Sequence, residues 1–312
     1  MTVAADTHPR ARTGGVGLRD MMFVIRQTGE RTAEAAAAVL REQLGPHAHG
    51  AVQIVEDRPF SRAVASTLRI AATCGRPWTI GMDADVLLVS QGVERLRQMC
   101  EEAAPKTFTV TGLMLCKFYG GFVFRGVHCY RASLTAHAMN LVGTRTPDGP
   151  DPELKPESAV VHAMAARGHP YEGRPLVLAA HDFEQSYRHI YLKMRLRGRR
   201  EAEATTGADL PGLIRFCAER AAAGDQDFVV AGWGIDDGAA DARRGAAGAY
   251  DWAAAWPEFE TRMTAARLRE KPPLSAAAAH GLADRLVASH DLTTDTRTPA
   301  WIRHELGKRG VP

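Results

Sequence analysis

Three apolar segments alternate with two helical segments in the first part of the chain, and this alternation restricts the chain to few folds. Strands are predicted at residues 21–26, 51–55 and 78–82, and amphipathic helices at residues 32–44 and 61–73. Strands and helices that alternate at this spacing are typical of parallel strands joined by crossover helices. The expected fold class is therefore α/β, with a mostly parallel sheet flanked by helices.

Polar residues follow each of these strands, at the end where ligands bind in parallel sheets. The first strand leads into the turn Gln27–Arg31, the second into Glu56-Asp57, and the third into Asp83-Ala84-Asp85. We expect these groups to meet at one edge of the sheet and to bind a ligand there. Arginines that could pair with phosphate at this edge are Arg26, Arg31, Arg58 and Arg62.

The pair Asp83 and Asp85 suggests a metal site. Two carboxylates one residue apart at a strand end can both face one cleft, where Mg²⁺ or Mn²⁺ takes them as oxygen ligands. Such an ion usually shares its coordination with phosphate oxygens of a substrate. The same Asp-x-Asp pattern also occurs in surface turns, so the rest of the sequence has to decide between the two interpretations.

Two further candidates lie at element boundaries later in the chain. Glu157 follows Pro156 in the first turn of a predicted helix, and His181 follows a strand predicted at residues 175–180. Each also has a plain structural explanation. An acid stabilises the first turn of a helix, and a histidine after a strand can be a hydrogen-bonded, half-buried side chain.

The strand–helix alternation stops near residue 200, and helical patterns rich in alanine follow. We expect a flexible tail at residues 1–19, an α/β domain at residues 20–200 and a mainly helical extension at residues 201–312. The basic stretch Tyr187–Arg200 is typical either of a solvated helix face or of a peripheral contact with a membrane surface or a lipid-diphosphate acceptor.

Composition excludes several classes of protein. The formal charge of +3 is too small to indicate a nucleic-acid partner. No signal-peptide pattern and no run of about 18 apolar residues occur, so we expect no transmembrane segment. The five cysteines show no Cys-x-x-Cys spacing, which favours a reducing cytoplasm. Abundant Ala, Arg and Gly indicate a GC-rich bacterial genome.

Taken in order, the motifs of residues 20–200 resemble those of the nucleotide-sugar-dependent glycosyltransferases with the GT-A fold, most closely the inverting family 2. The matching series is a polar turn after the first strand, acids after the second, an Asp-x-Asp, a glycine loop, an acid opening a helix and a late histidine. In this sequence the corresponding residues are Gln27–Arg31, Glu56 and Asp57, Asp83 and Asp85, Gly120-Gly121, Glu157, and His181.

The resemblance implies roles for these residues. Asp83 and Asp85 would bind Mn²⁺ or Mg²⁺ and the sugar nucleotide, His181 would be a further metal or phosphate contact, and Glu157 would be the base of an inverting transfer. A UDP- or GDP-sugar would be the donor, and a glycan, a lipid-linked molecule or a small molecule the acceptor; a homo-oligomer is compatible with it. Residues expected to contact the donor are Thr28, Glu30, Arg31, Glu56, Asp57, Arg62 and Asp83.

The sequence departs from the family in two places. The second strand usually ends in Asp-Asp-Gly-Ser, whereas Glu56-Asp57-Arg58-Pro59 stands here, which puts the contacts to base and ribose in doubt. The catalytic acid usually comes as an Asp/Glu pair, whereas Glu157 is followed by Ser158, and Glu153 is an alternative base.

Two other interpretations stay open. The chain could be a degenerate GT-A-like module for binding or assembly, or a phosphate-transferring enzyme that uses the Asp-x-Asp metal site. Haloacid-dehalogenase-type enzymes carry that motif on the first strand, with Gly-Thr or Gly-Val after the second Asp. Here Val86-Leu87 follows, on the third strand.

Overall fold

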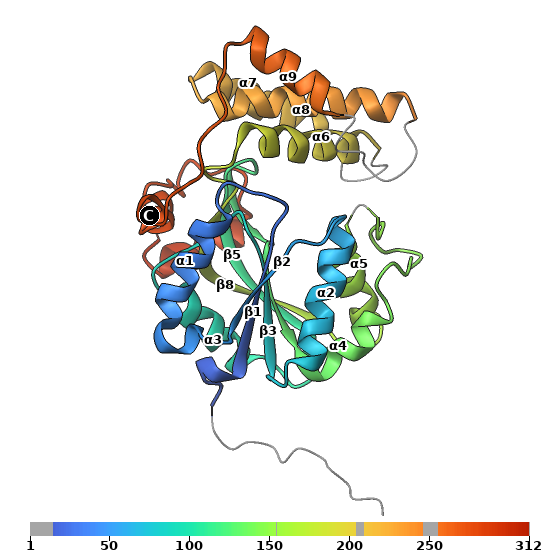
Figure 1. Cartoon of the computed structure of the whole chain (residues 1–312), viewed down its shortest axis with the longest axis vertical. Coiled ribbons are helices and arrows are strands. Elements are labelled where there is room, and N and C mark those ends of the chain that lie inside the picture. The colour runs from blue at the N-terminus through green and yellow to red at the C-terminus, as the bar shows by residue number, and fades with distance from the viewer. Residues whose placement is uncertain (1–14, 154, 204–208, 246–254, 312) are drawn as a thin grey trace, which may run out of the picture.

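The computed structural model describes residues 15–153, 155–203, 209–245 and 255–311 (Figure 1). Most of the tail predicted at residues 1–19 therefore lies outside the described residues. Its last part forms a short 3-10 helix at Leu18–Asp20, which leads directly into the first strand.

An eight-stranded sheet forms the centre of the molecule, in the order β2-β1-β3-β7-β5-β8-β4, with β6 paired to β5. The pairs β1–β2, β1–β3 and β5–β8 are parallel, whereas β7, β6 and β4 run antiparallel to their neighbours. The strands are β1 (Met21–Arg26), β2 (Val52–Val55), β3 (Trp78–Asp83), β4 (Val86–Leu88), β5 (Thr109–Cys116), β6 (Gly121–Phe124), β7 (Val127–Arg131) and β8 (Tyr171–His181).

Helices cover both faces of the sheet, as the alternation predicted. One face packs against α1 (Ala33–Leu44) and α3 (Gly92–Glu102), and their apolar side chains join those of β1 in the main core. The other face packs against α2 (Phe60–Thr73), α4 (Ala132–Met139) and α5 (Pro156–Ala165). The predicted α/β class is confirmed.

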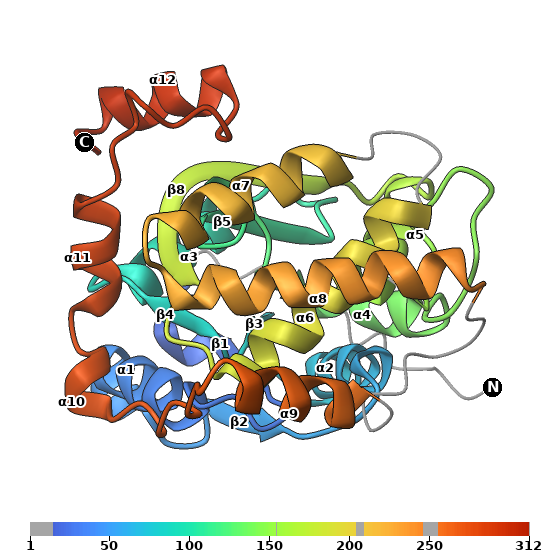
Figure 2. The same ribbon diagram turned by 90° about the horizontal axis from the view of Figure 1, so that it is seen from above.

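The C-terminal part is mainly helical, as expected, and it divides between two places. One group forms its own apolar cluster above the sheet (Figure 1), and the other returns along α1 and β8 (Figure 2). The first group is α6 (Tyr187–Glu203), α7 (Leu210–Ala222), α8 (Gln226–Arg243) and α9 (Trp256–Ala265); the second is α10 (Ala276–Ala279), α11 (Leu282–Ala288) and α12 (Ala300–Lys308). The domain boundaries at residues 19/20 and 200/201 stay predictions.

Close packing between α6 and α8 depends on glycine. A Cβ on Gly238 would lie 1.9 Å from the carbonyl oxygen of Arg195, and one on Gly234 would lie 2.4 Å from that of Tyr191. The two helix backbones therefore touch, which fixes α6 in its place over the sheet. No helix in the described part of the chain is long and apolar enough to cross a membrane.

The strands β6 and β7 differ from the sequence interpretation. Residues 120–125 read as a glycine loop, and Tyr130 as the start of a helix, because each apolar run there is too short to identify a strand. In the structure β7 pairs with β3 and β5, and α4 begins only at Ala132. This antiparallel strand makes the sheet mixed and, as shown below, supplies two side chains to the candidate site.

Candidate functional site

The carboxyl ends of β1, β3 and β8 bring the charged residues of the sequence motifs together. Arg26 and Asp83 end β1 and β3 and are register partners, and His181 ends β8 opposite Val86 of β4. Helix α6 lies over this edge of the sheet (Figure 1). Ligands bind at this edge in open α/β sheets, so we treat it as the candidate site.

The turn between β3 and β4 is held by Ala84. Its N–H donates to the carbonyl oxygen of Arg26 at 2.9 Å, and its own carbonyl accepts from Thr32 Oγ1 at 2.8 Å. The Thr32 hydroxyl is thus used here and makes no hydrogen bond as the cap of α1. Ala84 is fully buried and Asp85 is 3% exposed, so this turn is packed into the protein.

Five residues form what we call the Arg26 cluster: Arg26, Asp83, His128, Tyr130 and Glu157. The buried guanidinium of Arg26 lies between two carboxylates, 2.9 Å from Asp83 Oδ1 and 2.6 Å from Glu157 Oε1. Glu157 also accepts a hydrogen bond from the Tyr130 hydroxyl, and His128 Nε2 lies 3.2 Å from its Oε2. Glu157 is therefore held on both oxygens.

The pKa values of the two acids in this cluster are shifted in opposite directions. Burial acts to raise the pKa of Glu157, but the charge of Arg26 and the contact with His128 outweigh it and hold that pKa below its ordinary value. The pKa of Asp83 is raised to about 7 by burial, against the charge of Arg26, and the carboxylates of Asp85 and Glu157 add to the rise. A cation bound beside Asp83 would lower its pKa again.

A second group, the Lys193 cluster, consists of Cys116, His181, Asp182, Asp85 and Lys193. The ammonium of Lys193 donates to Asp85 Oδ2, and at 2.5 Å to Asp182 Oδ1. His181 also belongs to this cluster: its Nδ1 lies 3.1 Å from Asp182 Oδ2 and 3.4 Å from Cys116 Sγ. All but Lys193 are buried; the side chain of Lys193 is 39% exposed.

Charges in this cluster are fixed by mutual contact. Burial acts to lower the pKa of Lys193, but the charges of Asp182 and Asp85 raise it well above its ordinary value. Burial lowers the pKa of His181, so its ring is neutral. Burial and the charge of Asp182 raise the pKa of the Cys116 thiol to about 12. Lys193 is consequently the permanent cation of the cluster.

The Asp-x-Asp carboxylates each have one oxygen that makes no hydrogen bond within the described residues. Asp85 Oδ1 is buried without a hydrogen-bond partner among the described residues, and it lies 3.5 Å from His181 Nε2. No hydrogen bond or ion pair within the described chain engages Asp83 Oδ2. One oxygen on each acid is thus uncommitted, and Mg²⁺ is usually held by one or two carboxylates together with substrate phosphates.

A complete three-ligand cage is not formed by Asp83, Asp85 and His181. Among the described residues, the set whose ligand atoms all lie within 4.8 Å of one another is instead Cys116, His181 and Asp182. The structure brings Asp85 and His181 together, whereas Asp83 faces Arg26.

The predicted donor contacts after β1 mostly hold loops together. Glu30 accepts from the backbone N–H of Thr28 at 2.6 Å and from its hydroxyl at 2.8 Å. Arg31 donates to the carbonyl of Pro272 at 2.5 Å and to the carboxylate of Glu184 at 2.8 Å. Arg31 therefore ties the first loop to the loop after β8, and its charge is already paired.

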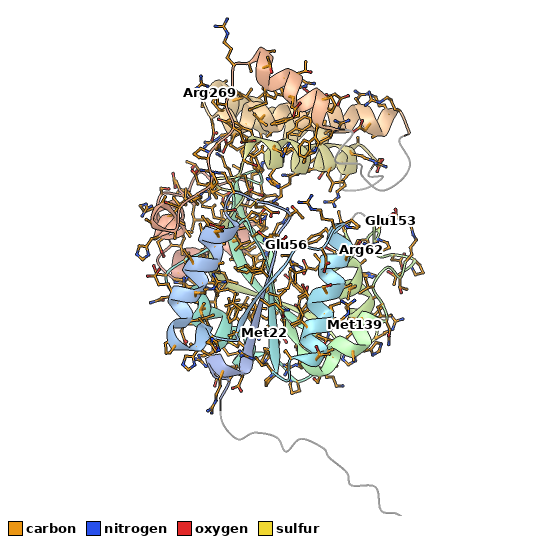
Figure 3. The ribbon with its side chains drawn as sticks, viewed as in Figure 1. Met22, Glu56, Arg62, Met139, Glu153 and Arg269 are labelled. Atoms are coloured by element: carbon orange, nitrogen blue, oxygen red, sulfur yellow. The ribbon has the colours of Figure 1, made fainter. Side chains whose placement is uncertain are left out.

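The candidates after β2 lie at the same end of the molecule, beneath α6 (Figure 3). Glu56 accepts from Gln27 Nε2 at 2.6 Å, and both Glu56 and Asp57 line a pocket of about 320 Å³ between β2 and α2. Arg62 is exposed near the start of α2. The alternative base Glu153 is exposed on the loop before α5.

Lys193, Asp182, His128 and Tyr130 belong to the site but were not selected from the sequence. The basic stretch of α6 read as a solvated face or a membrane contact, whereas the structure turns several of its cations inward. Lys193 enters the site, Arg195 pairs with Asp241 at 2.7 Å, and Arg197 donates to the carbonyl of Phe118 at 2.8 Å. The available signal was that Lys193 stands one helical turn after the apolar residue Ile190, which the structure buries.

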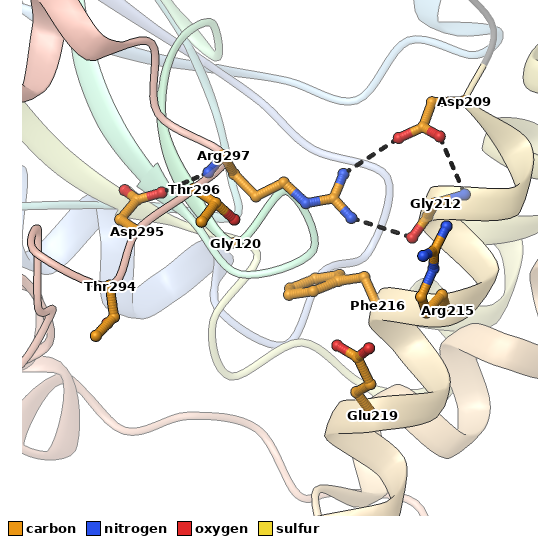
Figure 4. A pocket seen from close by; sticks show the side chains of 10 residues that line it. All are labelled: Gly120, Asp209, Gly212, Arg215, Phe216, Glu219, Thr294, Asp295, Thr296 and Arg297. Carbon is orange, nitrogen blue, oxygen red and sulfur yellow. Dashed lines mark hydrogen bonds and ion pairs between the residues drawn. The ribbon is translucent and has the colours of Figure 1, made fainter.

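A second pocket, of about 480 Å³, lies between α7 and the segment before α12 (Figure 4). Arg297 lies 3.5 Å from Asp209 Oδ2, donates to the carbonyl of Gly212 at 3.0 Å and stacks over the ring of Phe216. These contacts hold the C-terminal segment to α7.

No family model matches the sequence, and no curated protein matches it. Twelve chains of solved structures match it. One is a glycosyltransferase involved in glycosylation of the major capsid of PBCV-1, with 12% identity and a TM-score of 0.37; the match covers 52% of this chain and 94% of that chain. Another, described as a glucose-1-phosphate thymidylyltransferase from Bacillus anthracis in complex with sucrose, has 11% identity and a TM-score of 0.30, covering 49% of this chain and 87% of that one. At these values neither structure indicates what this chain binds or transfers.

The architecture itself defines the class of fold. A mostly parallel sheet flanked by helices, with a helical C-terminal part, is consistent with the GT-A-like fold expected from the sequence. Membership of the GT-A glycosyltransferases stays a prediction.

Proposed function

We propose that this chain is a glycosyltransferase that moves a sugar from a nucleoside-diphosphate sugar to an acceptor hydroxyl. The observation that carries this proposal is the uncommitted, buried Asp85 Oδ1 beside Asp83 at the carboxyl edge of the sheet. A buried carboxylate oxygen without a partner is costly, and a cation that also binds diphosphate would satisfy it. The ordered series of motifs in the sequence supports the same conclusion.

The cations of the site suit a diphosphate leaving group. Lys193 is charged and 39% exposed, so its ammonium can contact a phosphate while it stays on Asp85 and Asp182. Arg62 is exposed at the start of α2, near the same edge. Fixed positive charge at the leaving group stabilises the negative charge that develops there during transfer.

Mn²⁺ or Mg²⁺ would be held by Asp83 and Asp85, and His181, whose Nε2 lies 3.5 Å from Asp85 Oδ1, would orient Asp85. When bound, such an ion acts as a Lewis acid on the diphosphate oxygens. Arg26 positions Asp83 through a hydrogen bond of 2.9 Å from its Nε to Asp83 Oδ1. The backbone hydrogen bond of Ala84 fixes the turn between the two acids. These chain residues set the geometry before any ligand arrives.

Glu157→Gln tests the proposed base. We expect transfer to fall about 100-fold, at the low end of the effect of general acid–base catalysis, because the lowered pKa of Glu157 makes it a weak proton acceptor. Donor binding should change little. The measurement is steady-state transfer beside a donor-binding assay. Full transfer in the variant would assign the base to Glu153 or remove the need for one.

A thermal-shift panel tests the proposed donor class. Nucleoside diphosphates and nucleotide sugars are added to the protein with Mn²⁺, with Mg²⁺ or with a chelator. A ligand that binds only the folded state raises stability by about 2.7 kcal/mol at a concentration 100 times its Kd. We expect one nucleotide to raise the Tm by several degrees, and only with metal present.

The other outcomes separate the remaining interpretations. A shift by inorganic phosphate and metal, without preference for any nucleotide, would favour a phosphate-transferring enzyme. No shift with any nucleotide or phosphate would overturn the proposed function and favour a degenerate module for binding or assembly.

A further inference from the structure

Cys116, His181 and Asp182 place three metal-binding atoms at one point of the Lys193 cluster. The separations are 3.4 Å between His181 Nδ1 and Cys116 Sγ, 3.1 Å between His181 Nδ1 and Asp182 Oδ2, and 3.3 Å between Cys116 Sγ and Asp182 Oδ2. All three residues are buried. Within the described residues this is the set of three that could hold one metal ion.

These separations match the edges of a tetrahedral zinc site. Zinc binds sulfur at about 2.3 Å and nitrogen or oxygen at about 2.0–2.2 Å, which gives ligand–ligand distances of about 3.3–3.6 Å. The three observed edges lie within a few tenths of an ångström of that range. Thiolate and imidazole ligands also select Zn²⁺ over Mg²⁺, which prefers oxygen alone.

We propose that Cys116, His181 and Asp182 form a zinc site with an open fourth position, separate from the Mn²⁺ or Mg²⁺ site at Asp83 and Asp85. This proposal does not depend on the glycosyltransferase function. The thiol proton of Cys116 passes to solvent when the ion binds. The thiolate and the Asp182 carboxylate then balance the two charges of zinc.

Groups around the three ligands fit the second shell of a zinc site. A histidine that binds metal through one nitrogen usually donates its other N–H to a carboxylate, which fixes the ring. His181 Nε2 lies 3.5 Å from Asp85 Oδ1, an oxygen that makes no hydrogen bond within the described residues. The second oxygen of Asp182 is held by Lys193 at 2.5 Å. His181 then orients against Asp85 and does not ligate the ion at Asp83.

The backbone at Asp182 adopts a left-handed conformation. Asp182 has φ of +67°, a conformation that is uncommon for residues other than glycine and is tolerated best by Asp and Asn. Such conformations concentrate at functional sites. Asp182→Asn can keep this backbone while it removes the charge, which makes it a suitable test variant.

The test measures zinc in the untagged, full-length protein. After dialysis against a chelator, the protein is titrated with Zn²⁺ against a competing indicator, and separately loaded with Co²⁺ for absorption spectroscopy. We expect one tight equivalent of Zn²⁺ in the absence of nucleotide, and a thiolate-to-cobalt charge-transfer band. Cys116→Ser should abolish the band, and both Cys116→Ser and Asp182→Asn should weaken binding at least as much as the loss of an outer-shell partner does, which is about 10–100-fold.

Cys217→Ser is the matched control, because Cys217 is a buried free cysteine in α7 outside this cluster. It should keep the zinc equivalent and the cobalt band. Circular dichroism reports whether Cys116→Ser folds, and Asp182→Asn decides the matter if it does not. Failure of the wild-type protein to bind zinc, or a cobalt band that survives in Cys116→Ser, would overturn the assignment and leave a buried hydrogen-bond network. Neither of these zinc-binding results changes how the thermal-shift panel with nucleotides is interpreted.

Discussion

Asp85→Asn is expected to remove the metal-dependent thermal shift by the donor nucleotide and to lower transfer by about 1,000-fold or more. A metal at a leaving group is worth several kcal/mol, and each 1.36 kcal/mol changes a rate tenfold. Asparagine has the size of aspartate, so the 4% exposed side chain still fits its place. The charge that would hold the cation is lost.

The variant is compared with wild type at matched Mn²⁺ concentrations, by thermal shift and by transfer rate. Asp148→Asn, at an exposed aspartate on the loop before α5, is the control and should behave as wild type. Lys193 keeps one carboxylate partner in Asp85→Asn, so circular dichroism should show a folded protein. Metal-dependent binding that survives in this variant would contradict the assignment of Asp85.

The strands that position Asp83 and Asp85 were predictable because the signal is local. Apolar runs, a helix of regular period and polar residues after each strand identify β1 to β3 without knowledge of the rest of the chain. The meeting of Arg26 with Asp83 then follows from parallel register. The antiparallel strand β7 depends on pairing with β3 and β5, which short apolar runs do not reveal.

The partners inside the site could not be read from the sequence for a similar reason. Arg26 and Glu157 are 131 residues apart, and Lys193 and Asp85 are 108 residues apart. Spacing within one helix shows which residues share a face but not what that face contacts. Lys193 in a basic stretch therefore looked like surface, although its ammonium neutralises two buried carboxylates. Burial of charge is a property of the tertiary structure. From the sequence alone, only the carboxylates next to strands could be identified as candidates.

Arg26→Met is expected to lower the free energy of unfolding by about 3–5 kcal/mol, the cost of removing one partner from a buried ion pair. The Arg26 side chain is 1% exposed and separates Asp83 from Glu157. Methionine fills much of the same volume and keeps contact with Phe60, whose ring the guanidinium covers at 5.0 Å. The loss then reports the missing charge and not a cavity. Urea unfolding at pH 7 measures it.

Arg62→Met is the control, since Arg62 is exposed on α2 and such changes usually stay within about 0.5 kcal/mol. The double variant Arg26→Met/Glu157→Gln should recover part of the loss, because it removes the carboxylate that the first change leaves unpaired. Residues in contact show coupling energies of about 0.5–3 kcal/mol. If the losses in free energy of unfolding of the two single variants simply add in the double variant, the two side chains contribute through packing alone.

The dependence of stability on pH gives an independent check on the ion pair between Arg26 and Glu157. Arg26 helps to lower the pKa of Glu157 in the folded protein, so the unfolded chain binds this proton more tightly. That stabilisation is complete above the ordinary glutamate pKa of about 4.3 and is lost as the pH falls toward the lower folded value. Arg26→Met lacks this contribution, and burial then acts on Glu157 with less opposition, so the deficit of the variant against wild type should shrink as Glu157 is protonated, starting above about pH 4.3 and continuing below it. A deficit that stays constant through this range would show that Arg26 acts on stability without holding Glu157 in its charged form.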